Sequence, residues 1–277
     1  MPPLKIVIRG VDVVVTAQPL NSTAFAPFGE VIQNPRPDVH PSKFADAGPL
    51  PLDAVSANQG SAIKYQHVTR MVNRYAQAPS GRPGVAVMNM FVCAARALKT
   101  RPSRSHSSTS AARVFEVNIL ERHPFTTQTF SPLSTSGSGE RDLGSKEGYL
   151  VIVAPRLDRP SAPSSGQTSP GTSSAPGIYH AGPEHDQPDP TQLKAFIATI
   201  DQAVTYGAGI WHAPMVALGP EGSTVDFVVT QFANGVGIED CEEVVFESPE
   251  KDGHLLVELP PPSGSEAAQG LQVNSKL

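Results

Sequence analysis

Cysteine is nearly absent from this sequence, which has only Cys93 and Cys241 in 277 residues. Their spacing matches no zinc motif, so we expect two thiols without a role in metal binding. No apolar run approaches the roughly 18 residues of a membrane-spanning helix, and no signal peptide is recognisable. These absences predict a soluble, intracellular protein with no membrane partner.

Basic residues show neither an excess nor any clustering. The chain has 21 Lys and Arg against 26 Asp and Glu, which gives a net charge of −5. A nucleic-acid surface needs clustered Lys and Arg to neutralise phosphates. We therefore expect no nucleic-acid partner.

Short apolar stretches separated by turn residues dominate the chain, which has 28 prolines and 23 glycines. Many short strands predict a mainly β barrel or sandwich with a few short helices. Residues 149–154 lack alternation, which predicts a strand covered on both faces. A helix is expected to begin at residues 189–192, with Asp189 as its cap and Phe196 and Ile197 on one apolar face.

One domain is expected over residues 1–250, because the candidate chemical residues are spread over the middle and the C-terminal half. Residues 155–180 are rich in Pro, Ser and Gly and cannot bury a core, so they predict an insertion loop. Residues 251–277 are expected to form a flexible tail.

The tail ends in a possible targeting signal formed by Ser275, Lys276 and Leu277. A free C-terminal Ser-Lys-Leu is the address that the peroxisomal import receptor reads. It predicts that receptor as a partner and a peroxisomal location, with a cytoplasmic location if the signal is not read.

The stretch from Leu120 to Leu133 holds the main candidate site. An alternating apolar strand leads into it, and positions i and i+2 of a strand face the same way, so Glu121 and His123 share a face. Gln128 would return on the next strand, after Pro124 turns the chain. Carboxylate, imidazole and carboxamide groups are thus expected close together.

This spacing is similar to the metal site of many small β-barrels. Those sites use His-x-His, about four further residues, a Glu, and a last His two strands later. Glu121-x-His123-x4-Gln128 has this layout with two ligands altered, and His212 is the candidate for the last position. The alternative is a strand–turn–strand with ordinary surface polar residues.

Three separated stretches carry a family resemblance: 57–64, 120–130 and 202–214. In this order they resemble the ureidoglycolate lyase family, in particular its fungal members. The resemblance implies a cupin-like double-stranded β-helix, a homodimer, and cleavage of ureidoglycolate to glyoxylate and urea in allantoin and purine catabolism. The implied fold agrees with the strand-rich pattern, and the implied pathway agrees with a peroxisomal address.

The implied reaction takes a proton from the substrate hydroxyl and needs an acid or donor at the departing urea nitrogen. Imidazole titrates near neutral pH, so His123 and His212 are the candidates for proton transfer. Glu121 would be the base or would orient His123. Tyr206 is a candidate donor to the leaving group.

The substrate also has to be held. Gln128 and Asn89 are expected to bind the urea or hydroxyl group by hydrogen bonds. The substrate carboxylate needs a cation, and this chain has Val92 where other members carry an arginine. The candidates to replace that arginine are Lys64, Arg122 and Arg96.

Metal use stays open at this point. Glu121, His123, Gln128 and His212 could supply oxygen and nitrogen ligands to a divalent ion such as nickel, zinc or manganese. Such an ion would polarise the hydroxyl and lower its pKa.

Two other functions also stay open. The first is hydrolysis of ureidoglycolate at its amide, which would release ammonia. The second is a catalytically dead cupin that binds a ligand, which Val92 favours.

Overall fold

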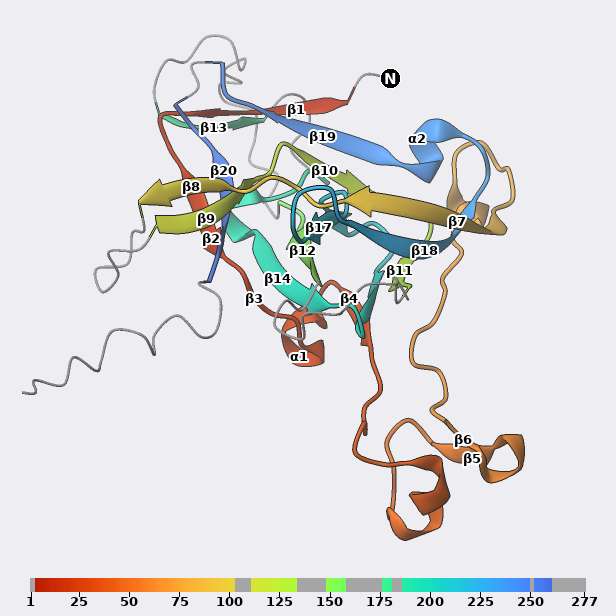
Figure 1. Ribbon diagram of the computed structural model, residues 1–277. Coiled ribbons are helices and arrows are strands. Elements are labelled where there is room, and N and C mark those ends of the chain that lie inside the picture. The colour runs from red at the N-terminus through yellow and green to blue at the C-terminus, as the bar shows by residue number, and fades with distance from the viewer. Residues whose placement is uncertain are drawn as a thin grey trace, which may run out of the picture.

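The computed structural model describes residues 3–102, 111–133, 148–157, 176–180, 186–249 and 252–260. Within them the fold is mainly β, as predicted, with strands in three larger sheets and one hairpin (Figure 1). None of the described helices is long and apolar enough to cross a membrane. The helices are short: α1 (Ser22–Phe25), α2 (Gly237–Asp240) and the 3-10 turns η1 (Pro41–Asp46), η2 (Asn58–Gly60), η3 (Tyr75–Gln77) and η4 (Pro190–Gln192).

The largest sheet has the order β13-β1-β19-β10-β16-β12-β14-β3, and β17 also pairs with β12. Every residue of β12 is buried, which confirms the prediction of a strand covered on both faces. The strands are β1 (Leu4–Arg9), β3 (Gln18–Pro19), β10 (Ile119–Arg122), β12 (Gly148–Ala154), β13 (Gly177–His180), β14 (Lys194–Thr199), β16 (Trp211–His212), β17 (Val216–Leu218) and β19 (Glu242–Glu247).

The helix predicted from Asp189 is wrong beyond its first turn. Asp189 caps η4 through its carboxylate, which accepts from the Thr191 amide, but Lys194–Thr199 then form β14. Ile197 pairs with Leu150 of β12 in the antiparallel register. Pairing with a fully buried strand satisfies both backbones, and this tertiary gain overrides the local helical pattern.

A second sheet packs on one face of the first and has the order β4-β15-β11-β18-β7. Its strands are β4 (Gly29–Ile32), β7 (Val85–Ala94), β11 (Gln128–Pro132), β15 (Ala203–Tyr206) and β18 (Thr224–Ala233). Phe130, Tyr149 and Phe227 meet edge to face in the core between the sheets. Gly29 is required here, because a Cβ at its φ of +155° would lie 1.8 Å from the Thr205 carbonyl oxygen. The two facing sheets agree with a cupin-like fold.

A third sheet covers the other side of the molecule and has the order β2-β20-β9-β8. Its strands are β2 (Val13–Thr16), β8 (Lys99–Pro102), β9 (Ala111–Glu116) and β20 (Leu255–Leu259). β20 lies inside the predicted tail, so a flexible tail from residue 251 is wrong for this stretch. Leu255 and Val257 are at most 1% exposed and belong to the core, which explains why the strand is fixed.

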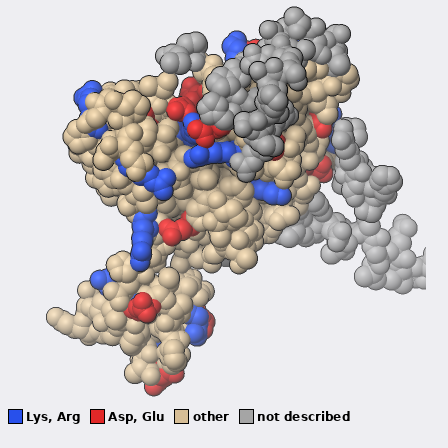
Figure 2. All heavy atoms as spheres, turned by 180° about the vertical axis from the view of Figure 1, so that it is seen from behind, with Lys and Arg blue, Asp and Glu red and all other residues tan. Residues whose placement is uncertain are grey.

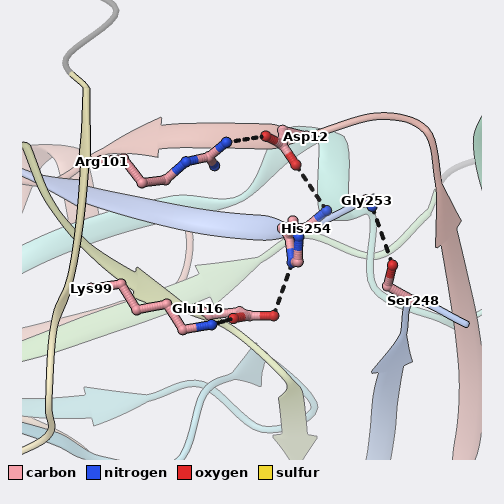
Figure 3. A network of polar contacts seen from close by, with 7 residues as sticks. All are labelled: Asp12, Lys99, Arg101, Glu116, Ser248, Gly253 and His254. Atoms are coloured by element: carbon pink, nitrogen blue, oxygen red, sulfur yellow. Dashed lines mark hydrogen bonds and ion pairs between the residues drawn. The ribbon is translucent and has the colours of Figure 1, made fainter. Parts of the chain in front are cut away.

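Polar contacts also hold β20 in place (Figure 3). The His254 ring bonds to the Glu116 carboxylate at 3.0 Å, and its backbone amide donates to Asp12. Glu116 in turn pairs with Lys99, and Asp12 pairs with Arg101. These contacts connect β20 to β8, to β9 and to the turn between β1 and β2.

Two other predicted segments fall partly outside the described residues. The predicted insertion loop, 155–180, ends in β13, which pairs antiparallel with β1, so this end of the prediction is wrong. Residues 158–175 lie outside the described part, as do Ser275, Lys276 and Leu277.

Residues 33–68 form an arm that stands away from the body (Figure 1). The arm contains η1, η2 and the hairpin of β5 (Val55–Ala57) and β6 (Ala62–Lys64). Seen from the opposite side, it is a separate lobe with acidic and basic side chains on its surface (Figure 2). At its base the Thr69 hydroxyl donates to the Glu30 carboxylate on β4, which ties the arm to the second sheet.

Candidate active site

The polar residues of the central motif meet where the first two sheets face each other. Glu121 on β10 pairs directly with His212 on β16, so both side chains emerge on the same face of the large sheet. Gln128 begins β11 in the second sheet and pairs with Tyr206 and Gln231 on the two flanking strands. Strand pairing thus brings together residues that are far apart in sequence.

His212 is 1% exposed and is held on both ring nitrogens. Its Nδ1 lies 3.0 Å from the Ile210 carbonyl oxygen, and its Nε2 lies 3.1 Å from the Gln128 Oε1. Glu121 Oε1 is 3.5 Å from the same Nε2. The Tyr206 ring stacks on the imidazole at 4.0 Å, with an interplanar angle of 10°. The orientation of His212 is therefore determined by its neighbours.

His123 is held on one nitrogen only. Its Nδ1 donates to the Asp240 carbonyl oxygen at 2.5 Å, which leaves a lone pair on Nε2 in the neutral ring. That Nε2 is buried and has no hydrogen-bond partner among the described residues. The ring centroid lies 5.5 Å from that of His212. A buried nitrogen without a partner is costly, so His123 is poised to accept a proton or to bind a ligand.

Burial and neighbouring charge shift the acid–base behaviour of the site. Burial, and then the charge of His212, lower the pKa of His123, so this ring stays neutral at neutral pH. Burial alone would raise the pKa of Glu121, but the hydrogen bond and charge of His212 outweigh it and lower this pKa overall. Burial raises the pKa of Tyr206 well above its ordinary value. The site therefore combines a neutral imidazole, a carboxylate and a protonated phenol.

The same residues fit a divalent metal. Potential ligand atoms of Glu121, His123 and His212 all lie within 4.8 Å of one another. In both histidines Nδ1 faces a backbone carbonyl, the arrangement that directs Nε2 toward a metal. The Gln128 oxygen, beside His212, could complete the set.

Three predicted substrate-binding residues do not join this group. Arg122 lies on β10 next to Glu121 and so points to the opposite face, where it pairs with Glu242 at 2.7 Å and lies over the Trp211 ring. Lys64 lies on the arm. Asn89 is exposed on β7, on the same face as Val229 and Gln231. Arg96, the further cationic candidate, lies over Phe115 in the other core.

Val92 lies in a different place from the one the sequence suggested. It pairs with Asp226 on β18, whereas Val87 pairs with Gln231. Alternation puts Val92 on the face of the second sheet that points away from Gln128 and Gln231. An arginine at this position would face Asp226, whose buried Oδ1 has no partner among the described residues. The absence of an arginine at residue 92 therefore does not remove a group from the site.

Sequence reasoning missed two neighbours of the site. Gln231 accepts a hydrogen bond from Gln128 Nε2 at 2.7 Å and fixes the orientation of that carboxamide. Cys241 lies close to Glu121 and Glu243, and burial, followed by the charge of Glu121, raises its pKa to about 12. A protonated thiol is a poor metal ligand. The alternating pattern of β18 could have indicated Gln231, but nothing local in the sequence indicates the pairing of β19 with β10.

Comparison with known proteins finds one family and several of its members. The sequence model of the family described as ureidoglycolate lyase matches residues 12–251. A ureidoglycolate lyase of Schizosaccharomyces pombe is 35% identical over 84% of this chain and 92% of its own. Ureidoglycolate lyases of Saccharomyces cerevisiae and Azotobacter vinelandii are 29% and 27% identical, over 78% and 89% of this chain and 85% and 99% of theirs. The range that the family model matches includes every residue of the site.

Proposed function

The chain belongs to the ureidoglycolate lyase family, and we propose that it cleaves ureidoglycolate to glyoxylate and urea at the Glu121–His123–His212 site. The observation that carries this assignment to the site is His123 Nε2, a buried nitrogen without a hydrogen-bond partner in the described chain. It faces the interior beside a second histidine and a carboxylate. Two proton-transfer groups next to each other are what this elimination requires.

His123 is the base in this mechanism. Its lowered pKa keeps Nε2 unprotonated, so it can take the proton from the substrate hydroxyl. The O–H electrons then form the carbonyl of glyoxylate, the C–N bond breaks, and its electron pair goes to the urea nitrogen. The Asp240 carbonyl stabilises the ring throughout, because it accepts the hydrogen bond from Nδ1.

His212 is placed to supply the second proton. Both of its nitrogens face oxygen atoms, with Glu121 and Gln128 beside Nε2, so a proton on Nε2 has acceptors that hold it. Transfer of this proton to the departing nitrogen completes the elimination and leaves neutral urea. Tyr206 positions the ring by stacking on it.

A divalent ion such as nickel, zinc or manganese would use the same atoms. Glu121, His123 and His212 would hold it, with Gln128 as a further oxygen ligand. A bound ion would polarise the substrate hydroxyl and make it more acidic. In that case the two histidines would act as ligands.

Turnover of racemic ureidoglycolate by the purified protein tests the proposal, with urea, glyoxylate and ammonia measured separately. We expect equal amounts of urea and glyoxylate and no ammonia. Ammonia without urea would identify the hydrolase. Ligand binding without turnover, under every metal condition, would identify a dead cupin.

The same assay after chelator treatment separates the two uses of the site. Loss of activity that nickel, zinc or manganese restores would make Glu121, His123 and His212 metal ligands. Unchanged activity would leave them as proton-transfer groups.

A peroxisomal location is a further part of this proposal. Its support is the C-terminal Ser275-Lys276-Leu277, which the import receptor would read. Breakdown of a purine-derived ureide suits that compartment.

A homodimer is also proposed, and the second sheet supports it. Its edge strand β7 exposes five large apolar side chains, and monomers rarely leave such edges uncovered. Their exposed fractions are 64% for Val85, 74% for Met88, 58% for Met90, 42% for Phe91 and 64% for Val92. Analytical ultracentrifugation should give the mass of two chains, and Met88→Lys with Met90→Lys should shift it toward one.

A further inference from the structure

The arm has secondary structure of its own but no buried side chain. Across residues 33–68 every side chain is exposed or only partly covered, including the apolar Phe44, Val55 and Ile63. Ordering each residue costs about 1–2 kcal/mol in conformational entropy, which burial normally offsets. The described residues of a single copy leave the arm without a buried side chain. Another surface has to provide this burial.

The backbone of the arm is also strained. Six non-glycine residues of the described chain have positive φ, and five of them lie in the arm: Leu52, Asp53, Asn58, Gln59 and His67. Such conformations cost of order 1–3 kcal/mol each and persist where surrounding contacts enforce them, often at binding sites. Their concentration here points to an arm shaped for a contact.

The body of the molecule also has an exposed apolar surface, on strand β7. β7 exposes apolar side chains between Val85 and Val92 and carries no charged residue along its length. One of its faces is continuous with the site, because Val87 pairs with Gln231 and Asn89 pairs with Val229. The exposed Val85 and Phe91 lie on this face, whereas Met88, Met90 and Val92 lie on the opposite one, so a surface that docks on the Val85–Phe91 face would lie next to the site.

No lysine or arginine among the described residues is bonded to the residues of the site. Among the described residues, no hydrogen bond or ion pair joins a lysine or arginine side chain to Glu121, His123, Gln128 or His212. The neighbouring Arg122 is occupied by Glu242 and points to the other face. Glu243, which pairs with Glu121 across β10 and β19, makes the surroundings more acidic. A positive charge for the substrate carboxylate therefore has to come from outside this group of residues.

Lys64 offers such a charge. It ends β6 in the arm and is exposed, and its ammonium group has no hydrogen bond or ion pair within the described part of the chain. Lys43, in the same arm, already pairs with Asp46. An unpaired cation and an acidic site without a cation complement each other electrostatically.

We propose that the arm docks on the body of a second copy of the chain, and that Lys64 of the arm binds the substrate carboxylate at the Glu121–His123–His212 site of that copy. This rests on the proposed function, which supplies the carboxylate. In a dimer with twofold symmetry each copy gives one arm and receives one, so the arm and the β7 surface of each copy are both covered. The two sites are then each built from two chains.

Complementation between two defective variants tests this directly. Lys64→Ala lacks the cation and His123→Ala lacks the base, so each homodimer has two defective sites. A mixed dimer has one intact site if the arm acts on the partner copy, and none if it acts on its own copy. Coexpression with two affinity tags, followed by isolation of the mixed dimer, should recover about half of the wild-type activity per dimer.

The single variants set the reference for this experiment. Lys64→Ala should raise KM at least about tenfold with a smaller effect on kcat, since a carboxylate contact is present before and during the reaction. Lys64→Arg should restore most of the affinity. Lys43→Ala, on the same arm, should behave as wild type. A Lys64→Ala enzyme with normal KM, or an inactive mixed dimer, would overturn the proposal.

A second measurement does not depend on activity. Lys64→Cys combined with Glu243→Cys, under mild oxidation, should give a covalent dimer on a non-reducing gel, whereas Lys43→Cys with Glu243→Cys should not. A crosslink in a protein that fails to turn over ureidoglycolate would keep the arm exchange and reject the proposed function. Turnover by the wild type with no intermolecular crosslink and no complementation would reject the arm exchange alone.

Discussion

His123 shows how a single contact sets the chemistry of a residue. Donation from Nδ1 to the Asp240 carbonyl decides which nitrogen carries the hydrogen, and burial lowers the pKa so that Nε2 stays free. Neither effect is visible at residue 123 itself, because Asp240 lies 117 positions away in the chain. The role of the histidine is therefore a property of its surroundings.

Replacement of His123 by Gln tests this role. Without the base, kcat should fall by about 100-fold or more, the usual range for loss of general acid–base catalysis. His254→Gln is the matched control, because this histidine bonds to Glu116 on the far sheet and should leave kcat unchanged. Near-normal turnover by His123→Gln would remove this residue from the mechanism.

The pH profile of the wild type gives a further check. Because the folded-state pKa of His123 is lowered from 6.5, the neutral ring persists below this pH and is lost only as the pH falls further. The acid limb of kcat/KM should therefore lie below pH 6.5. An acid limb above 6.5 would contradict the burial effect or assign the limb to another group.

At the scale of elements, β20 depends on a network of charges as well as on apolar burial. The hydrogen bond from Lys99 is the main cause that lowers the pKa of Glu116, burial opposes it, and the bond from His254 adds to it (Figure 3). A carboxyl whose pKa is lower in the folded state stabilises the fold above its ordinary value of 4.5, and this contribution is lost as the pH falls through the folded-state pKa.

Glu116→Gln should therefore destabilise the protein at pH 7 by about 1 kcal/mol and much less at a pH below the folded-state pKa of the carboxyl, where the wild-type group is protonated as well. Urea unfolding at the two pH values measures this difference. Glu247→Gln is the control, because Glu247 forms only an exposed pair with Lys5 and should change the unfolding free energy little. Equal losses from the two variants would show that the network adds nothing to β20.

At the scale of the whole molecule, the location of the protein and its chemistry are separable. The C-terminal tripeptide lies outside the described residues and no site residue belongs to the tail. Deletion of Ser275, Lys276 and Leu277 should leave kcat and KM of the purified enzyme unchanged but move a fluorescent fusion from peroxisomes to the cytosol. Continued import would show that another signal is read.

The arm and β7 are two exposed surfaces whose role we assign to the dimer. Each is an uncovered surface among the described residues of one copy, and the proposed contact between two copies joins them. The site then becomes a property of the dimer. Turnover and association should consequently fall together when the protein is diluted below its dimerisation constant.

Local sequence was sufficient for features that depend on a single strand or a single turn. Alternation placed Glu121 and His123 together, the unbroken apolar run predicted the buried β12, and Asp189 caps the turn that was expected to begin there. Local sequence gave the wrong prediction where pairing with a strand distant in the sequence decides the secondary structure. Lys194–Thr199 became a strand because β12 pairs with it, and Leu255–Leu259 left the predicted tail because β2 and β9 flank them.

The sequence by itself determined the mainly β fold and indicated Glu121, His123 and His212 as site residues, because strand periodicity and residue chemistry are local properties. Only the tertiary structure decided which of them meet. Register placed His212 against Glu121, turned Arg122 and Val92 to the opposite faces, and left Lys64 on the arm. The physical reason is that a strand offers two faces and two edges, and the hydrogen bonds to its neighbours select among them.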